Sequence, residues 1–231
     1  MTRQLCSAVI VLLLVSGSAF ATSGVLLQFQ GLNDLQAVGD FYNGGGLAAT
    51  PNYGVSFSSN VLAMKSACLA LPCQSNPGPG SGNFVRTPVG NTAIFINGGM
   101  GSAVTATMNV APGFSSGFNF FFTAGFTGNQ AETIKIWSGN NGTGTVLATI
   151  ILANNNASCT TPTYCMWSNA GATFTGTAHS VTFTGPADML GLADITLGSS
   201  STAIPEPSTL YLLGTGLVGV SAGSIRRFFK A

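Results

Sequence analysis

The stretch VTATMNVAPGFSSGFNFFFT, residues 104–123, decides the fold class of this protein. Apolar side chains stand at every second position on both sides of a Gly/Ser-rich centre, namely at Val104, Ala106, Met108, Val110, Phe118, Phe120 and Phe122. Alternation of this kind is typical of half-buried strands, because successive side chains of a strand point to opposite faces of the sheet. We therefore expect two strands here, separated by a Gly/Ser turn at 113–117.

The same period of two continues through most of the chain. Further candidate strands lie at 25–29, 53–57, 61–65, 83–86, 93–96, 134–137, 146–152, 180–184 and 195–197. Turns rich in Gly, Pro and Asn separate them, and no segment between 22 and 197 has a convincing helical period. About ten short strands joined in this way predict an all-β domain, an antiparallel β-sandwich of the jelly-roll type.

Charge is very sparse in this protein. Only 6% of the 231 residues are charged, and residues 22–204 hold five acidic and three basic side chains. Nucleic-acid binding is excluded, because it needs a basic patch. Charge-driven disorder is excluded by the 45% apolar content. A surface of Asn, Ser, Thr and Gly can form hydrogen bonds with sugars but offers little acid–base chemistry.

The first 21 residues, MTRQLCSAVIVLLLVSGSAFA, have the three parts of a secretory signal peptide. Arg3 provides the positive start, residues 5–15 the apolar core, and Ala19 and Ala21 the small-x-small cleavage site. The core is too short to span about 30 Å of hydrocarbon. We expect signal peptidase to cut after Ala21.

Residues 205–231 combine three features in a fixed order. They are a Pro-Glu-Pro triplet, an apolar segment and a basic cluster: Pro205, Glu206 and Pro207, then 210–225, then Arg226, Arg227 and Lys230. As a helix, 210–225 would be about 24 Å long, which is short for a permanent span. The basic cluster places the end of the chain on the cytoplasmic side. The prolines keep the triplet extended and accessible.

This order of features, together with the signal peptide, resembles the PEP-CTERM sorting signal. The resemblance implies that an exosortase, a membrane-embedded cysteine protease-transpeptidase, recognises Pro-Glu-Pro and removes the tail. It also implies a Gram-negative host that produces exopolysaccharide. The stretches 39–45, 52–57 and 193–199 are similar to ones found in ectodomains of this family.

The expected domain organisation follows from both ends of the chain. It comprises a signal peptide (1–21), a β-sandwich ectodomain (22–197), a linker (198–204) and the sorting signal (205–231), whose segment 210–225 is a single transmembrane helix.

Four cysteines follow the signal peptide, and they allow three disulfide connectivities. We expect local pairing, Cys68 with Cys73 and Cys159 with Cys165, because an exported chain meets an oxidising compartment. Such small loops gain little chain entropy from a cross-link, so the bridges would fix loop shape. Cysteine-only zinc ligation is the rival, but neither pair has the two-residue spacing of zinc sites.

One stretch of the sequence matches the nucleophile motif of serine hydrolases. Gly113-Phe-Ser115-Ser-Gly117 matches G-x-S-x-G, and Glu132 and His179 follow in triad order. That motif must turn a strand into a helix, whereas a strand pattern follows here. The carboxylates are also too scattered to nominate a glycosidase pair. We therefore assign no catalytic residue and expect no enzyme.

Two further groups of side chains have both a functional and a structural interpretation. Extracellular sandwiches often hold structural Ca²⁺, for which Asp34, Asp40 and Asp194 are the candidates; the alternative is three surface or turn aspartates. No other metal or cofactor is expected. Four aromatic residues can stack on sugar rings or pack in the core: Tyr42, Tyr53, Trp137 and Trp167.

The sequence thus predicts an exported, non-enzymatic protein of the outer surface or extracellular matrix. It would be anchored transiently in the inner membrane, processed by signal peptidase and an exosortase, and associated with polysaccharide or biofilm. A hydrolase of exopolysaccharide and a self-assembling coat protein are the alternatives.

Overall fold

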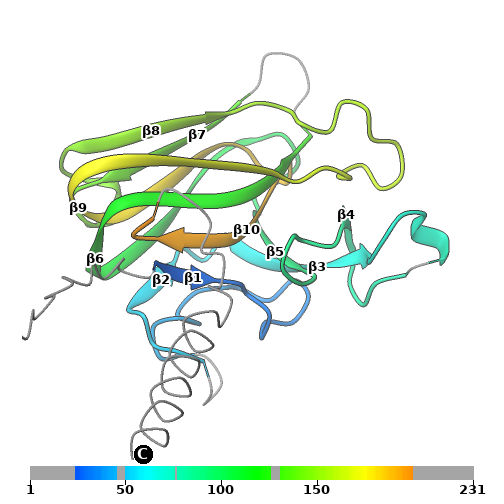
Figure 1. Ribbon diagram of the computed structural model, residues 1–231, viewed down its shortest axis with the longest axis horizontal. Helices are drawn as coiled ribbons and strands as arrows, with labels where there is room; N and C mark the ends of the chain where they lie inside the picture. Colours follow the sequence, from blue (N-terminus) through cyan, green and yellow to red (C-terminus); the bar gives the residue numbers. More distant parts are fainter. Residues whose placement is uncertain (1–23, 46–49, 76, 126–130, 200–231) are drawn as a thin grey trace, which may run out of the picture.

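The computed structural model describes residues 24–45, 50–75, 77–125 and 131–199 (Figure 1). These residues form ten strands and two short 3₁₀ helices: β1 (Val25–Leu27), β2 (Val55–Phe57), β3 (Val61–Cys68), η1 (Cys73–Ser75), β4 (Gly82–Val85), β5 (Thr92–Ile96), β6 (Ala103–Ala124), β7 (Glu132–Trp137), η2 (Asn140–Gly142), β8 (Val146–Leu152), β9 (Ser168–Pro186) and β10 (Leu190–Leu197). The all-β class expected from the alternation is confirmed.

Hydrogen bonds link the strands in the order β4-β3-β5-β10-β6-β9-β7-β8, while β1 pairs with β10 and β2 with β6. The pairs are antiparallel except β3 with β4, which run parallel. The sheet is therefore mixed, a departure from the purely antiparallel arrangement that we expected.

The two longest strands fold this sheet into two facing layers. Residues 180–186 of β9 pair with 103–109 of β6, and residues 168–178 pair with 114–122. In a straight strand, Ala172 and Phe183 would lie about 36 Å apart. Yet the ring of Phe118, the partner of Ala172, lies 6.5 Å from the ring of Phe183. The β6–β9 ribbon therefore bends back, so that its two halves face each other.

The bend lies in the Gly/Ser-rich segment of β6. Gly113 and Ser116 have φ angles of 71° and 75°, in the left-handed region that favours glycine. The β6–β9 register shifts between Asn109 and Phe114 and again between Ser115 and Ser116, as at β-bulges. Our prediction of a turn at 113–117 was therefore wrong. Pairing with β9 continues past the bulges, so the two expected strands are halves of one.

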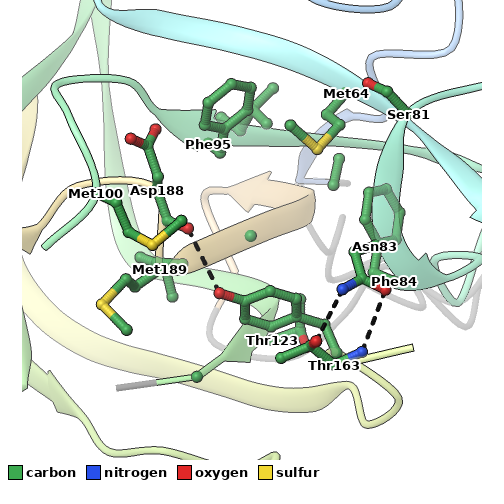
Figure 2. Close-up of a pocket in the computed structure, with 16 residues that line it drawn as sticks. Met64, Ser81, Asn83, Phe84, Phe95, Met100, Thr123, Thr163, Asp188 and Met189 are labelled. Atoms are coloured by element: carbon green, nitrogen blue, oxygen red, sulfur yellow. Dashed lines mark hydrogen bonds between the residues drawn. The ribbon is translucent and has the colours of Figure 1, made fainter. Parts of the chain in front are cut away.

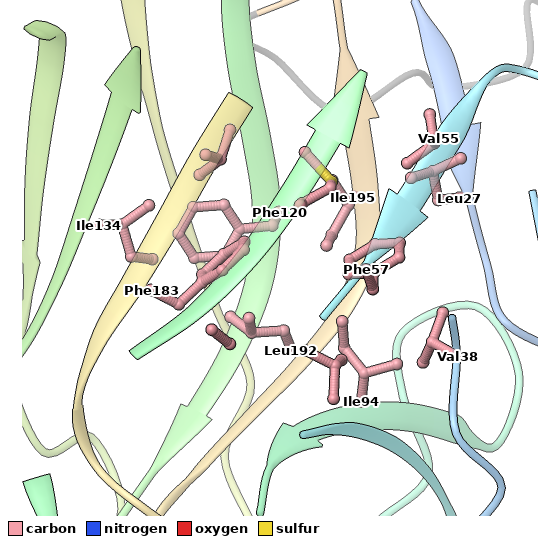
Figure 3. Packing of buried hydrophobic residues seen from close by; sticks show 14 of the residues in the cluster. Leu27, Val38, Val55, Phe57, Ile94, Phe120, Ile134, Phe183, Leu192 and Ile195 are labelled. Carbon is pink, nitrogen blue, oxygen red and sulfur yellow. The ribbon is translucent and has the colours of Figure 1, made fainter. Parts of the chain in front are cut away.

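The core fills the space between the two halves (Figure 3). Fully or almost fully buried side chains come from β6, β7 and β9 on one layer and from β5, β6 and β10 on the other; among them are Met108, Ile134, Val181 and Phe183, facing Ile94, Phe118, Phe120, Leu192 and Ile195. Burying one such side chain stabilises the fold by roughly 1.5–3 kcal/mol. The alternation seen in the sequence thus marks the inner faces of both layers.

Both expected targeting segments fall outside the described residues. The signal peptide (1–21) and the sorting segment with its helix 210–225 are not among them, so their boundaries stay predictions. Within residues 24–45, 50–75, 77–125 and 131–199, no helix is long and apolar enough to cross a bilayer.

Candidate functional site

A cleft of about 510 Å³ lies where β3, β5 and β10 meet two long loops (Figure 2). Met64 of β3, Phe95 of β5 and Gly191 of β10 line it, whereas their neighbours Ala63 and Leu192 are buried in the core. Because side chains alternate along a strand, the cleft lies on the outer side of this layer. We call it the Tyr164 cleft, after the tyrosine that the second loop contributes.

Two glycines of the Tyr164 cleft stand where a larger side chain would collide with a neighbouring residue. A Cβ at Gly191 would stand 2.9 Å from Cγ2 of Thr123, and a Cβ at Gly125 would stand 2.8 Å from Cε1 of Tyr164. Separations this short do not occur between real side chains, so larger residues would force a shift. The Tyr164 ring can therefore approach the end of β6 because position 125 has no side chain.

Each loop beside the cleft is closed by a disulfide. Cys68–Cys73 closes the loop after β3, with Cα atoms 4.8 Å apart, and Cys159–Cys165 closes the loop after β8, with Cα atoms 5.7 Å apart. The expected local pairing is confirmed. The second bridge ends at Cys165, the residue after Tyr164, so it restrains the position of Tyr164 beside the cleft.

Backbone and side-chain hydrogen bonds join the two loops. The backbone N–H of Tyr164 donates to the carbonyl of Asn83 (3.1 Å), and that of Val85 donates to the carbonyl of Tyr164 (3.0 Å). The Asn83 amide also donates to Oγ1 of Thr163 at 2.8 Å, a bond drawn in Figure 2. The Trp167 indole also joins the two loops, because it packs edge-on against the Phe84 ring with ring centroids 5.7 Å apart. These contacts within the protein hold the two loops beside the cleft together.

Asn156 anchors the second loop to β6. It is 5% exposed; its amide donates to Oγ1 of Thr123 at 2.8 Å, and its Oδ1 accepts from the backbone N–H of Met166 at 2.8 Å. The sequence identified this segment only as turn-rich. A buried asparagine that bonds both a strand and a loop fixes the position of the loop.

The Tyr164 cleft is lined by both apolar and polar side chains. Its lining combines aromatic rings and thioethers with the polar side chains of Ser81, Asn83, Thr123, Thr163 and Asp188. Burial, and then the charge of Asp188, raises the pKa of the Tyr164 hydroxyl, which donates to the Asp188 carbonyl at 3.4 Å. The phenol therefore stays a donor across the physiological pH range. Among the described lining residues Asp188 is the one carboxylate.

The three residues of the hydrolase alternative do not form a triad. Ser115 lies in the bend of β6, inside a strand, and His179 lies beside Gly113. Glu132 instead contacts Gly185, six residues further along β9, which is about 20 Å from His179. Glu132 is fully buried, its carboxyl oxygens have no hydrogen-bond partner among the described residues, and burial raises its pKa to about 8.

The three aspartates considered for calcium have separate partners. Asp34 accepts hydrogen bonds from Ser81 and from the backbone N–H of Lys65. Burial favours a higher pKa for Asp34, but these bonds outweigh it and the pKa is lowered. Asp40 accepts from Asn43, and buried Asp194 accepts from the N–H of Val89.

Burial raises the pKa of Asp194 to about 6, although the bond from the Val89 N–H opposes this rise. In the part of the chain that the structure describes, no group of three or more potential metal-ligating side chains gathers.

The aromatic candidates separate into packing and surface residues. Tyr42 belongs to the core, and its hydroxyl accepts from the Phe29 N–H at 2.8 Å; Tyr53 stacks on it. Trp137 is half-buried in β7, on the layer that does not carry the Tyr164 cleft. Sequence reasoning missed Tyr164, although its place next to Cys165 in a cross-linked loop was a usable signal.

Comparison with solved structures finds β-domains of low identity. The K2 cleaved adhesin domain of Lys-gingipain is 12% identical with a TM-score of 0.47, covering 76% of this chain and 99% of that one. A carbohydrate-binding module of Cellvibrio mixtus lichenase 5A is 15% identical with a TM-score of 0.30, covering 50% and 84%. A family 11 carbohydrate-binding module from Clostridium thermocellum is 10% identical with a TM-score of 0.32, covering 68% and 93%. At this level of likeness, none of them identifies a ligand of this chain.

Comparison with known sequences finds a match only near the C-terminus of the protein. No curated protein matches the chain. A family model matches residues 203–227, which include Pro205, Glu206 and Pro207 together with Arg226 and Arg227. The matched model is the PEP-CTERM protein-sorting motif, and the chain is therefore an exported protein that carries this sorting signal after its β-domain.

Proposed function

We propose that this protein is a non-catalytic, polysaccharide-binding component of the outer surface or extracellular matrix. Signal peptidase removes residues 1–21, and the segment 210–225 holds the precursor in the inner membrane. An exosortase then processes the chain at Pro205-Glu206-Pro207 and releases or re-anchors the β-domain. The sorting motif at 203–227 supports this route.

The Tyr164 cleft is the observation that carries the binding role. A pyranose ring presents apolar C–H groups on its faces and hydroxyls on its rim. The cleft presents the complementary set, with Phe95 and Tyr164 as rings and Ser81, Asn83 and Asp188 as polar partners. At about 510 Å³ it can hold one or two sugar units. Its disulfide-closed walls reduce the entropy lost on binding. We propose that it holds sugars of a neutral polysaccharide.

The proposed sorting route is tested on protein recovered from the surface or matrix of its native host. Mass spectrometry then identifies the C-terminal peptide. A terminus at or near Pro205–Pro207 is the expected result. A chain that still ends with residues 226–231 would mean a permanently tail-anchored protein and would contradict the proposed route.

The binding role is tested by affinity electrophoresis of the full chain, in mild detergent, through gels containing dextran or laminarin. Tyr164→Ala should lower the affinity about tenfold, because it removes a ring and a donor from the cleft. Tyr53→Ala, a change of the same size at a half-buried tyrosine outside the cleft, should not. Equal retardation of both variants would refute the assignment of the cleft.

A further inference from the structure

A second hollow, of about 450 Å³, lies on the other layer of the domain, on the outer side of β6, β9 and β7. The strand registers place Thr105, Thr184 and Thr133 side by side in one row across the three strands. The next row holds Thr107, Thr182 and Lys135. We call this hollow the threonine trough.

The trough is held in place by its own hydrogen bonds. The Trp137 indole N–H donates to Oγ1 of Thr182 at 2.9 Å, which fixes the ring along the sheet. The turn at η2 forms one wall, because the side chain of Asn109 bonds both the backbone N–H and the side chain of Asn141, each at 2.8 Å. Hydrogen bonds within the protein therefore fix both the Trp137 ring and the η2 wall of the trough.

Lys135 is the one charged residue that lines the trough within the described chain. Its ammonium lies 5.9 Å from the centre of the Trp137 ring, a cation–π contact. The nearest acid on the same strand, Glu132, is buried and has the opposite strand parity, so it faces the core. The described residues that line the trough thus present threonine hydroxyls, one indole ring and a single positive charge.

We propose that the threonine trough binds an acidic polysaccharide, one that carries uronate carboxylates. Lys135 would exchange its contact with the indole for a charge-assisted hydrogen bond to a carboxylate. The half-buried indole would then stack on the sugar ring, and the threonines would form hydrogen bonds with the sugar hydroxyls.

Charge complementarity and composition favour this occupant over others. A protein partner would need an apolar centre, whereas Trp137 is the only apolar side chain among the described residues that line the trough. A nucleic acid would need several cations. The trough and the Tyr164 cleft lie on different layers, so either assignment can fail without the other.

Trp137 itself provides the readout. The chain has two tryptophans, so the full chain carrying Trp167→Phe, purified in mild detergent, reports on Trp137 alone. Titration with alginate should change its emission, and dextran should not. Adding Lys135→Gln should weaken alginate binding about fivefold, as expected for an exposed ion pair. Raising the salt concentration should weaken it as well.

Arg86→Gln is the matched control, because it removes the same charge at an exposed position outside the trough. It should leave alginate binding unchanged. The proposal is overturned if alginate leaves the emission unchanged, if dextran changes it equally, or if Lys135→Gln binds as tightly as its parent. Lys135 is on the surface side of its strand, so this variant tests binding without disturbing the core.

Discussion

Glu132 should make the stability of this domain fall as the pH rises. Its carboxyl group is fully buried at the start of β7, and its oxygens have no hydrogen-bond partner among the described residues. Burial raises its pKa from 4.5 to about 8 in the folded protein. Between these two values the unfolded chain releases the proton while the folded chain keeps it, so the free energy of unfolding decreases with pH.

The size of the effect follows from the pKa difference. A difference of about 3.5 pKa units corresponds to about 5 kcal/mol lost between pH 4.5 and 8. Asp194, whose pKa is raised to about 6, adds a loss of the same sign between about pH 4 and pH 6. Above pH 6.5 Glu132 acts almost alone, and the expected loss from pH 6.5 to pH 8 is about 2 kcal/mol. That is a large part of a typical stability of about 5–15 kcal/mol.

The assay is urea unfolding of the full chain at pH 5, 6.5, 8 and 9, followed by tryptophan fluorescence. Glu132→Gln has nearly the same shape and no titration, so its curve should be flat between pH 6.5 and pH 9, and it should exceed the wild type in stability at pH 9. Asp40→Asn, at an exposed carboxylate, should keep the wild-type slope. A wild-type stability that is constant or rises from pH 6.5 to pH 8, or a slope that persists in Glu132→Gln, would refute the reasoning.

Three further sets of variants test the packing of the domain and the loops around the cleft. Gly185→Ala places a Cβ against the Glu132 carboxyl group and should cost about 2 kcal/mol of unfolding free energy, most of which should disappear in a double variant with Glu132→Ala. Asn156→Ala leaves the Met166 N–H and the Thr123 hydroxyl without their buried partner and should cost about 3 kcal/mol by urea unfolding. Replacing Cys159 and Cys165 by serine should lower stability by about 2 kcal/mol and weaken dextran or laminarin binding, whereas an unchanged affinity would mean that the bridge does not shape the cleft.

Local chemistry made part of the site predictable. The spacing of the cysteines and the export signal were enough to pair Cys159 with Cys165, because a short loop in an oxidising compartment closes on itself. Glu132 was also within reach, since it shares its strand parity with the buried Ile134 and Ile136.

The sequence by itself determined the all-β class, the inner face of most strands and the sorting signal, because alternation and short motifs are properties of neighbouring residues. Only the tertiary structure decided where β6 bends and what pairs with it. Apart from Phe174, residues 168–178 are small or polar, and they become a strand because they lie against 114–122. The Tyr164 cleft and the threonine trough likewise depend on pairings between strands far apart in the chain, and no local pattern encodes which distant strand will be the partner.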